Sequence, residues 1–301
     1  MSHDRCMGQG IVCLAILVSL VVSAGGAETG WLFLDNGQVR IGVDTNAGAA
    51  IGFFAESKNG RNLLNHYDKG RFLQQSWYGQ RDGSLWNKKP WVWNPVQGGS
   101  WRGAPARLLS IESTGDSLHA RLHPRHWAAG TLLTNVVMEE SIRLSNRVAH
   151  IRFRMHYHGE TQHPPTSQEM PAVFIDAALP NFVYYKGDRP WTGGELTRCV
   201  PIWPNQHDAL DEGWAAYVDE RDHGIGAFTP GMKRMTFYRH PGPTGPAGSG
   251  CSYFAPVTRM SIGPGFEHEY SVYLTIGSVA EIRDCFRVIQ EERAIKDDGG
   301  R

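Results

Sequence analysis

The chain has 301 residues, and its 30 basic and 30 acidic side chains leave no formal net charge at pH 7. A balanced charge disfavours nucleic acid and anionic membrane surfaces as partners, because both select an excess of Lys and Arg. The length suits one large domain or two small ones, and 35 Gly and 17 Pro residues are typical of a fold with many turns.

The first 27 residues have the pattern of a secretory signal peptide. Arg5 precedes an apolar run over residues 11–22, and the small residues 23–27 offer a cleavage region. The run is shorter than the roughly 20 apolar residues of a membrane span. We therefore expect a secreted or periplasmic protein without stable membrane insertion after cleavage, with a retained N-terminal anchor as the alternative.

Three cysteines would remain in the mature chain, namely Cys199, Cys251 and Cys285. An odd number permits at most one internal disulfide, and pairing of Cys199 with Cys251 stays open. No Cys spacing is typical of a zinc knuckle, and His156 and His158 form a His-x-His donor pair that is a weak metal signal without a third ligand at a set spacing. We expect no cofactor, although Asp residues in loops leave a structural Ca²⁺ open.

From Trp31 onward, short runs alternate apolar and polar residues, which is the period of half-buried β-strands. Strands are predicted at residues 38–43, 50–55, 107–113, 117–123, 132–144, 147–158, 172–177, 181–185, 213–219, 224–228, 234–239 and 270–276. No internal repeat or interdomain linker interrupts this series. The sequence therefore predicts one all-β domain over residues 28–296, a large antiparallel sandwich.

The strand at 147–158 has two contrasting faces. Its even positions carry Arg152, Arg154, His156 and His158, whereas its odd positions are apolar or aromatic. The basic face is either an ordinary solvated sheet surface or a concave surface that faces a sugar.

An aromatic and amide-rich stretch runs from residue 59 to residue 101, and we predict that it forms loops around a cleft. Flat rings stack on the apolar faces of pyranoses, while amides and guanidinium groups bind hydroxyls and carboxylates. The alternative is an aromatic core with polar residues at its turns. The predicted sugar-binding residues of this stretch are Arg71, Gln74, Gln75, Trp77, Trp93, Asn94 and Gln97.

One helix is predicted at the C-terminus. Ser278 and Glu281 form a capping-box pattern, and Val279, Ile282 and Phe286 lie on one face of the following helix. This amphipathic helix should pack against the sandwich edge, and residues 297–301 should form a disordered tail.

The order of these elements resembles the galactose-mutarotase-like β-supersandwich superfamily. The segment 67–78 is similar to the Gly-Arg loop of aldose epimerases, and segments 168–172, 187–193, 212–216 and 274–277 resemble exported members. The resemblance implies an activity on carbohydrate, since the superfamily contains aldose 1-epimerases, polysaccharide lyases and hydrolases, and accessory domains of glycosidases. Its epimerases use two His residues and a Glu, and neither His is matched here, so fold analogy alone does not choose a reaction.

A lyase acting on a poly- or oligosaccharide is the first hypothesis for the reaction. Between residues 71 and 101 only Asp82 is acidic, whereas the stretch 59–101 is rich in neutral amides and carries the phenols of Tyr67 and Tyr78. The sugar or its carboxylate would be held by Arg71, Gln75, Asn94 and Gln97. Tyr78, His156 or His158 would remove the neighbouring proton, and Arg154 would bind the substrate from the basic strand.

Two glutamates support the alternatives. Glu169 and Glu212 each stand at the entrance of a strand, where loop residues commonly enter sites, and Trp214 follows Glu212 as a sugar-stacking candidate. A Glu169/Glu212 pair would serve a glycoside hydrolase, and either would serve as the base of an aldose 1-epimerase. The non-enzymatic alternative is a sugar-binding module. Sugar identity, linkage, endo or exo action and oligomeric state are not readable from these residues.

Overall fold

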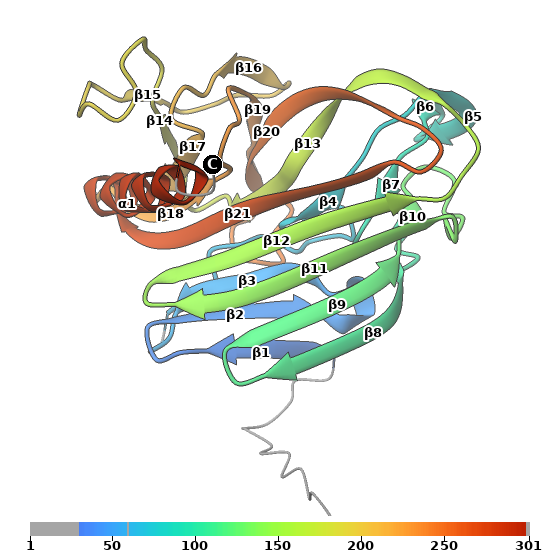
Figure 1. Cartoon of the computed structure of the whole chain (residues 1–301), viewed down its shortest axis with the longest axis horizontal. Coiled ribbons are helices and arrows are strands. Elements are labelled where there is room, and N and C mark those ends of the chain that lie inside the picture. Colours follow the sequence, from blue (N-terminus) through green and yellow to red (C-terminus); the bar gives the residue numbers. More distant parts are fainter. Residues whose placement is uncertain (1–29, 59, 299–301) are drawn as a thin grey trace, which may run out of the picture.

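The computed structural model describes residues 30–58 and 60–298, so the predicted signal peptide lies outside the described residues. Two large antiparallel sheets dominate the molecule, and the one α-helix of the described residues, α1 (Val279–Asp298), packs at one end (Figure 1). Within the described ranges, no helix is both long and apolar enough to cross a membrane.

The larger sheet has nine strands in the order β15-β14-β17-β18-β21-β12-β11-β9-β8. Its long central strands explain the clear alternation in the sequence, because one face of each is buried and the other is solvated. The bounds are β8 (Arg107–Thr114), β9 (Ser117–His123), β11 (Val136–Ser145), β12 (Val148–Tyr157), β14 (Asn181–Tyr184), β15 (Thr197–Cys199), β17 (Trp214–Val218), β18 (His223–Phe228) and β21 (Glu267–Ser278).

The second sheet has seven strands in the order β10-β7-β4-β13-β20-β19-β16. Its two longest strands, β13 and β20, pair along most of their length with register shifts near Glu169. The bounds are β4 (Gln74–Ser76), β7 (Pro95–Val96), β10 (Arg125–His126), β13 (His163–Asp176), β16 (Gln206–Ala209), β19 (Arg234–His240) and β20 (Cys251–Ile262).

Two smaller sheets complete the fold. A three-stranded sheet joins β1 (Trp31–Asp35), β2 (Val39–Asp44) and β3 (Ala50–Glu56), with a 3-10 turn, η1 (Thr45–Ala47), between the last two. The hairpin of β5 (Arg81–Trp86) and β6 (Lys89–Val92) stands apart from both large sheets in the hydrogen-bonding pattern.

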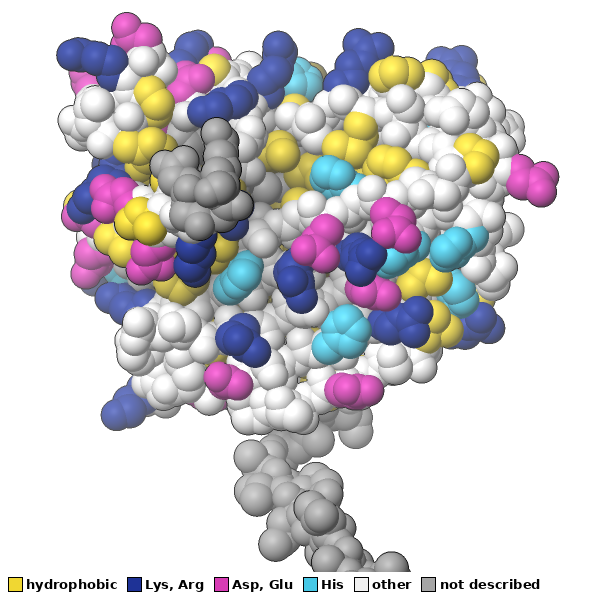
Figure 2. Space-filling view, viewed as in Figure 1, with side chains coloured by type: hydrophobic (Ala, Val, Ile, Leu, Met, Phe, Trp, Pro, Cys, Tyr) yellow, Lys and Arg dark blue, Asp and Glu magenta, His cyan; other side chains and the backbone are white. Residues whose placement is uncertain are grey.

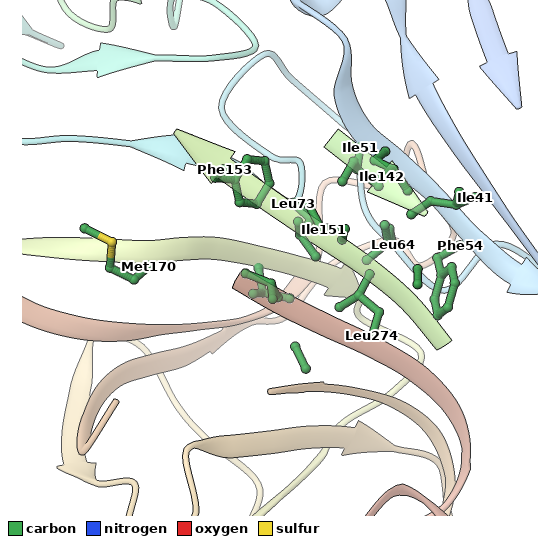
Figure 3. Packing of buried hydrophobic residues seen from close by; sticks show 14 of the residues in the cluster. Ile41, Ile51, Phe54, Leu64, Leu73, Ile142, Ile151, Phe153, Met170 and Leu274 are labelled. Carbon is green, nitrogen blue, oxygen red and sulfur yellow. The ribbon is translucent and has the colours of Figure 1, made fainter. Parts of the chain in front are cut away.

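The hydrophobic core lies between the sheets. Ile151 and Phe153 of β12 pack in one buried cluster with Met170 of β13 and Ile41 and Phe54 of the small sheet (Figure 3). All five side chains are almost fully buried. Burial of each large apolar side chain stabilises the fold by about 1.5–3 kcal/mol. The structure thereby confirms the predicted all-β sandwich with one C-terminal helix.

The capping box of α1 has the predicted geometry. The backbone N–H of Ser278 donates to Glu281 Oε2 at 2.8 Å, and the N–H of Glu281 donates to Ser278 Oγ at 3.3 Å. Ile282 and Phe286 of the same helix are fully buried against the nine-stranded sheet.

The structure differs from the predicted strands in several places, and β1, β15 and β16 lie outside every predicted range. The 59–101 stretch contains β4 to β7 rather than loops alone, and β13 begins at His163, ahead of the predicted strand at 172–177. No strand is predicted at β20, because its first six residues are buried on both faces and show no alternation. The helix continues to Asp298, and residues 299–301 lie outside the described ranges.

Candidate functional site

Tyrosine and histidine side chains gather on one face of the seven-stranded sheet. Tyr238 of β19 stands opposite Tyr253 of β20 in the ladder, and their ring centroids are 4.6 Å apart. His240 lies two residues beyond Tyr238 and therefore on the same face. Glu169 of β13 pairs with Val257, four residues along β20 from Tyr253, so β13 brings a carboxylate to this face.

Glu169 is the central charged group of the site. Tyr253 donates its hydroxyl hydrogen to Glu169 Oε1 at 2.5 Å. Burial raises the pKa of Glu169 to about 7, although hydrogen bonds from Tyr253 and Tyr78 act in the opposite direction. At neutral pH both the acid and the carboxylate are therefore populated, as a group that takes and returns protons requires.

The neighbouring phenols stay protonated. Burial, and after it the charge of Glu169, raises the pKa of Tyr78 and of Tyr253 well above the usual value. Both hydroxyls are consequently hydrogen-bond donors rather than bases at physiological pH.

A cavity of about 570 Å³ opens above these residues. Its aromatic wall includes Trp86, which lies 4.7 Å from Trp91 and 6.1 Å from Trp127 between ring centroids. Trp203 is half-exposed and contacts Tyr238 edge-on at 4.9 Å. Flat rings beside a few polar groups are typical of carbohydrate sites. The polar lining includes Asp68, Arg71, Ser76, Asn94, Asn205 and His240.

A second cavity of about 890 Å³ adjoins the first. Tyr78, Glu169 and Asn205 line both cavities and so mark the boundary between them. Three cationic side chains line the second cavity, from Lys233, Arg234 and Arg259.

Four of the predicted site residues line the first cavity, namely Arg71, Tyr78, Asn94 and Glu169. Arg71 Nη1 already donates to the carbonyl oxygen of Ser249 at 2.6 Å, and its guanidinium lies over the Tyr67 ring. Asn94 accepts a hydrogen bond from Trp91 Nε1 at 3.1 Å, so it also orients an aromatic wall residue.

The three other amides predicted to bind sugar, Gln74, Gln75 and Gln97, are fully buried. Gln74 donates to the carbonyl oxygen of Gly70 at 2.6 Å, and Gln75 donates to that of Glu139 at 3.0 Å. Gln97 donates to Glu140 Oε2 at 2.9 Å. These side chains do not line either cavity, and neither do the buried rings of Trp77 and Trp93. They hold the strands and loops that carry the site.

The basic strand face lies on the outside of the nine-stranded sheet. Arg154 Nη2 meets Glu267 Oε2 at 2.8 Å, and His156 Nδ1 lies 3.0 Å from Glu267 Oε1. His158 is exposed and lies beside His156. Figure 2 shows His, acidic and basic side chains interspersed on this face. Neither cavity includes Arg154, His156 or His158.

Glu212 and Trp214 lie under helix α1 and line neither cavity. Both oxygens of Glu212 meet the guanidinium of Arg283, at 2.6 and 3.0 Å. Glu212 also accepts from Trp214 Nε1 at 2.8 Å and from the backbone N–H of Trp191 at 2.7 Å. The structure therefore does not bring Glu212 together with Glu169.

Several residues of the site escaped the sequence analysis, namely Tyr238, His240, Tyr253 and Trp203. The alternation of Tyr238 and His240 on β19 is visible in the sequence and was the available signal.

For metal binding, the described residues contain no group of three or more His, Cys, Asp or Glu side chains that would hold an ion. All three described cysteines are free thiols.

Comparison with solved structures identifies the fold. A putative aldose 1-epimerase from Escherichia coli K12 superposes with a TM-score of 0.51 at 13% identity, over 83% of this chain and 100% of the other. A putative mutarotase from Salmonella typhimurium gives 0.52 at 11% identity, over 82% and 90%. A galactose mutarotase-like protein from Lactobacillus casei ATCC 334 gives 0.50 at 12% identity, over 82% and 100%.

These likenesses establish the fold as that of the galactose-mutarotase-like proteins. No protein-family model and no curated protein sequence matches the chain. The function therefore has to be argued from the site.

Proposed function

We propose that this protein interconverts the anomers of a reducing sugar, with Glu169 as the general base. One observation carries the proposal: a carboxyl group with a pKa of about 7 sits at the boundary of an aromatic cavity and is held there by a tyrosine hydroxyl. A base whose pKa lies near the working pH is the most effective proton shuttle. The likeness to structures named as an aldose 1-epimerase and a mutarotase supports the reaction class by analogy.

The reaction needs one proton to leave the sugar and another to enter it. Ionised Glu169 takes the proton of the anomeric hydroxyl, and O1 becomes a carbonyl oxygen as the bond between C1 and the ring oxygen breaks. The electron pair of that bond passes to the ring oxygen, which takes a proton from an acid. We assign this acid to His240, an imidazole of the same cavity. Rotation about C1–C2 and reversal of these steps give the other anomer and restore both groups.

Two features favour this reaction over the elimination and hydrolysis alternatives. The raised pKa of Tyr78 removes it as the base of a lyase at neutral pH. The carboxylate expected to pair with Glu169 in a hydrolase, Glu212, is bound to Arg283 at the other end of the sandwich.

Glycoside hydrolysis stays a second candidate because Asp68 lines the same cavity as Glu169. A pair of carboxyl groups across a glycosidic bond would satisfy that mechanism.

We further propose that the protein acts outside the cytoplasm after removal of residues 1–27, which sequencing of the mature N-terminus would check.

Anomer exchange measured by NMR on aldoses and hexuronic acids tests the proposed reaction. The protein should accelerate exchange beyond the spontaneous rate, and Glu169→Gln should lower the enzymatic rate by about 10²–10⁴-fold. Glu267→Gln on the outer face is the matched control and should leave the rate unchanged. Absence of acceleration, combined with unsaturated uronates released from polysaccharide, would overturn the proposal in favour of a lyase.

A further inference from the structure

The second cavity carries a charge that anomer exchange alone does not require. Lys233, Arg234 and Arg259 line it, and among the described residues Glu169 is the acidic side chain that joins them there. Two of the cations contact backbone oxygens: Lys233 Nζ donates to Asp211 at 2.8 Å, and Arg259 Nε donates to Pro165 at 3.2 Å.

Within the described ranges, these three cations have no acidic partner, whereas the arginines of the outer face do. There, Arg154 meets Glu267 and Arg152 lies 3.8 Å from Glu269. By contrast, none of the three cations of the second cavity forms an ion pair with a described carboxylate. Their charge is therefore available to a ligand, and guanidinium groups bind carboxylates in a bidentate manner.

The strand register fixes how close these cations are to Glu169. Glu169 stands opposite Val257 of β20, and Arg259 lies two residues further along the same strand. Met235 of β19 pairs with Pro256 of β20, and Arg234 is the residue before Met235. β19 lies on the side of β20 opposite β13. With strands about 4.8 Å apart and residues about 3.3 Å apart along a strand, both arginine backbones lie on the order of 8–10 Å from that of Glu169. Long arginine side chains cover much of this span.

A single bound pyranose can reach into both cavities. The ring edge that carries the anomeric carbon also carries the ring oxygen and C5. A ring stacked in the aromatic cavity with its anomeric hydroxyl at Glu169 can therefore direct the substituent of C5 past Glu169 into the cationic cavity. In a hexuronic acid this substituent is a carboxylate.

We infer that the sugar bound at this site is a hexuronic acid, whose ring occupies the aromatic cavity and whose carboxylate is bound by Arg234 and Arg259. This inference rests on the proposed function for the placement of the anomeric carbon at Glu169. The two arginines would determine specificity and would not take part in proton transfer.

Binding measurements test the inference separately from catalysis. Dissociation constants for glucuronate, galacturonate, glucose and galactose would be measured by NMR titration on the protein and on Glu169→Gln, which binds but should not exchange anomers. We expect uronates to bind at least 10-fold more tightly than the matching neutral sugars. Arg234→Gln and Arg259→Gln should each reduce this preference about 10-fold, since each removes a hydrogen bond between charged groups. Both side chains are exposed, so folding should be preserved.

Arg121→Gln is the matched control, because Arg121 is an exposed arginine of the outer face that meets Glu139. Equal affinity for neutral and acidic sugars would overturn the inference, and so would an unchanged preference in both arginine variants. Tighter binding of a sugar phosphate than of a uronate would also overturn it. The cationic cavity would then fit an anionic group held farther from the sugar ring than a C5 carboxylate. Uronate selectivity without anomer exchange in the unsubstituted protein would support the inference while refuting the proposed function.

Discussion

Glu169 and Glu212 lie in two regions of one sandwich, and the same type of side chain has a different role in each. The sequence places both at the entrance of a strand, but Glu169 lies in the middle of β13, and only Glu212 stands just before its strand, β17. At the cavity face of the seven-stranded sheet, Glu169 meets uncharged phenols, and burial raises its pKa to about 7. Under α1, Glu212 meets the guanidinium of Arg283 and two N–H donors.

The difference between these glutamates shows that the partners decide the role. A carboxylate whose oxygens all accept from a cation and from fixed N–H donors is a structural anchor, because it has no free lone pair for a substrate. A buried carboxyl group with hydroxyl partners keeps its proton available.

Glu212→Gln should be the most destabilising change. It leaves the buried Arg283 guanidinium without its counter-charge, and breaking a buried pair in this way costs about 3–5 kcal/mol. Urea unfolding followed by tryptophan fluorescence would measure this loss. Glu169→Gln, which removes no ion pair, should not destabilise the protein, and an equal loss in both variants would remove the contrast between the two regions.

Glu140 offers a third environment, in which a glutamate is buried without a matching charge. Gln97 donates to one oxygen, the other has no partner, and burial raises the pKa of Glu140 to about 8. The folded state therefore holds a proton that the unfolded chain releases above its ordinary pKa near 4.5. The associated stability is complete below pH 4.5 and is lost as the pH rises towards 8.

Glu140→Gln should remove this pH dependence. Variant and unsubstituted protein should unfold alike near pH 4.5, and the variant should become the more stable one towards pH 8. The expected gain is a few kcal/mol, at about 1.4 kcal/mol for each pKa unit. Thermal unfolding at a series of pH values would measure the gap, and a gap that does not widen with pH would contradict the assignment.

Tyr253→Phe should change the pH profile of the reaction more than its maximum rate. The Tyr253 hydroxyl stabilises the ionised form of Glu169, so its removal raises the pKa of Glu169 further. The acid limb of the profile should move to a pH about one unit higher. A profile that keeps its midpoint would show that this hydrogen bond does not control Glu169.

Arg154→Gln should have the smallest effect. The Arg154–Glu267 pair is solvated on the outer face, where exposed ion pairs contribute little. Neither the unfolding midpoint nor sugar binding should change measurably. A large loss of sugar binding in this variant would instead favour the outer face as the sugar-binding surface.

The sequence predicted the fold well because the long strands of the nine-stranded sheet bury one face each. β12 alternates buried and accessible residues along nearly its whole length, and the capping box placed the helix start correctly. The strand β20 escaped prediction because it is buried on both faces at its start, and this strand carries Tyr253. Composition alone could not separate Gln75, which is buried structurally, from Asn94 at the cavity, since both are neutral amides in one stretch.

The site itself depends on long-range pairing that no local pattern encodes. Glu169, Tyr253 and Tyr78 come from strands and loops far apart in the sequence, and the ladders of β13 with β4 and β20 unite them. The raised pKa of Glu169 follows from that burial and is invisible in the residue order.

The pH dependence of anomer exchange, measured by NMR for the protein and for Glu169→Gln on the same sugar, would show whether Glu169 is the base. If Glu169 is the base, the enzymatic rate should fall below a midpoint of about pH 7, because protonation removes the acceptor, and this limb should vanish with the activity in Glu169→Gln. An acid limb near pH 4.5, or an identical profile in the variant, would show that another group performs the proton transfer.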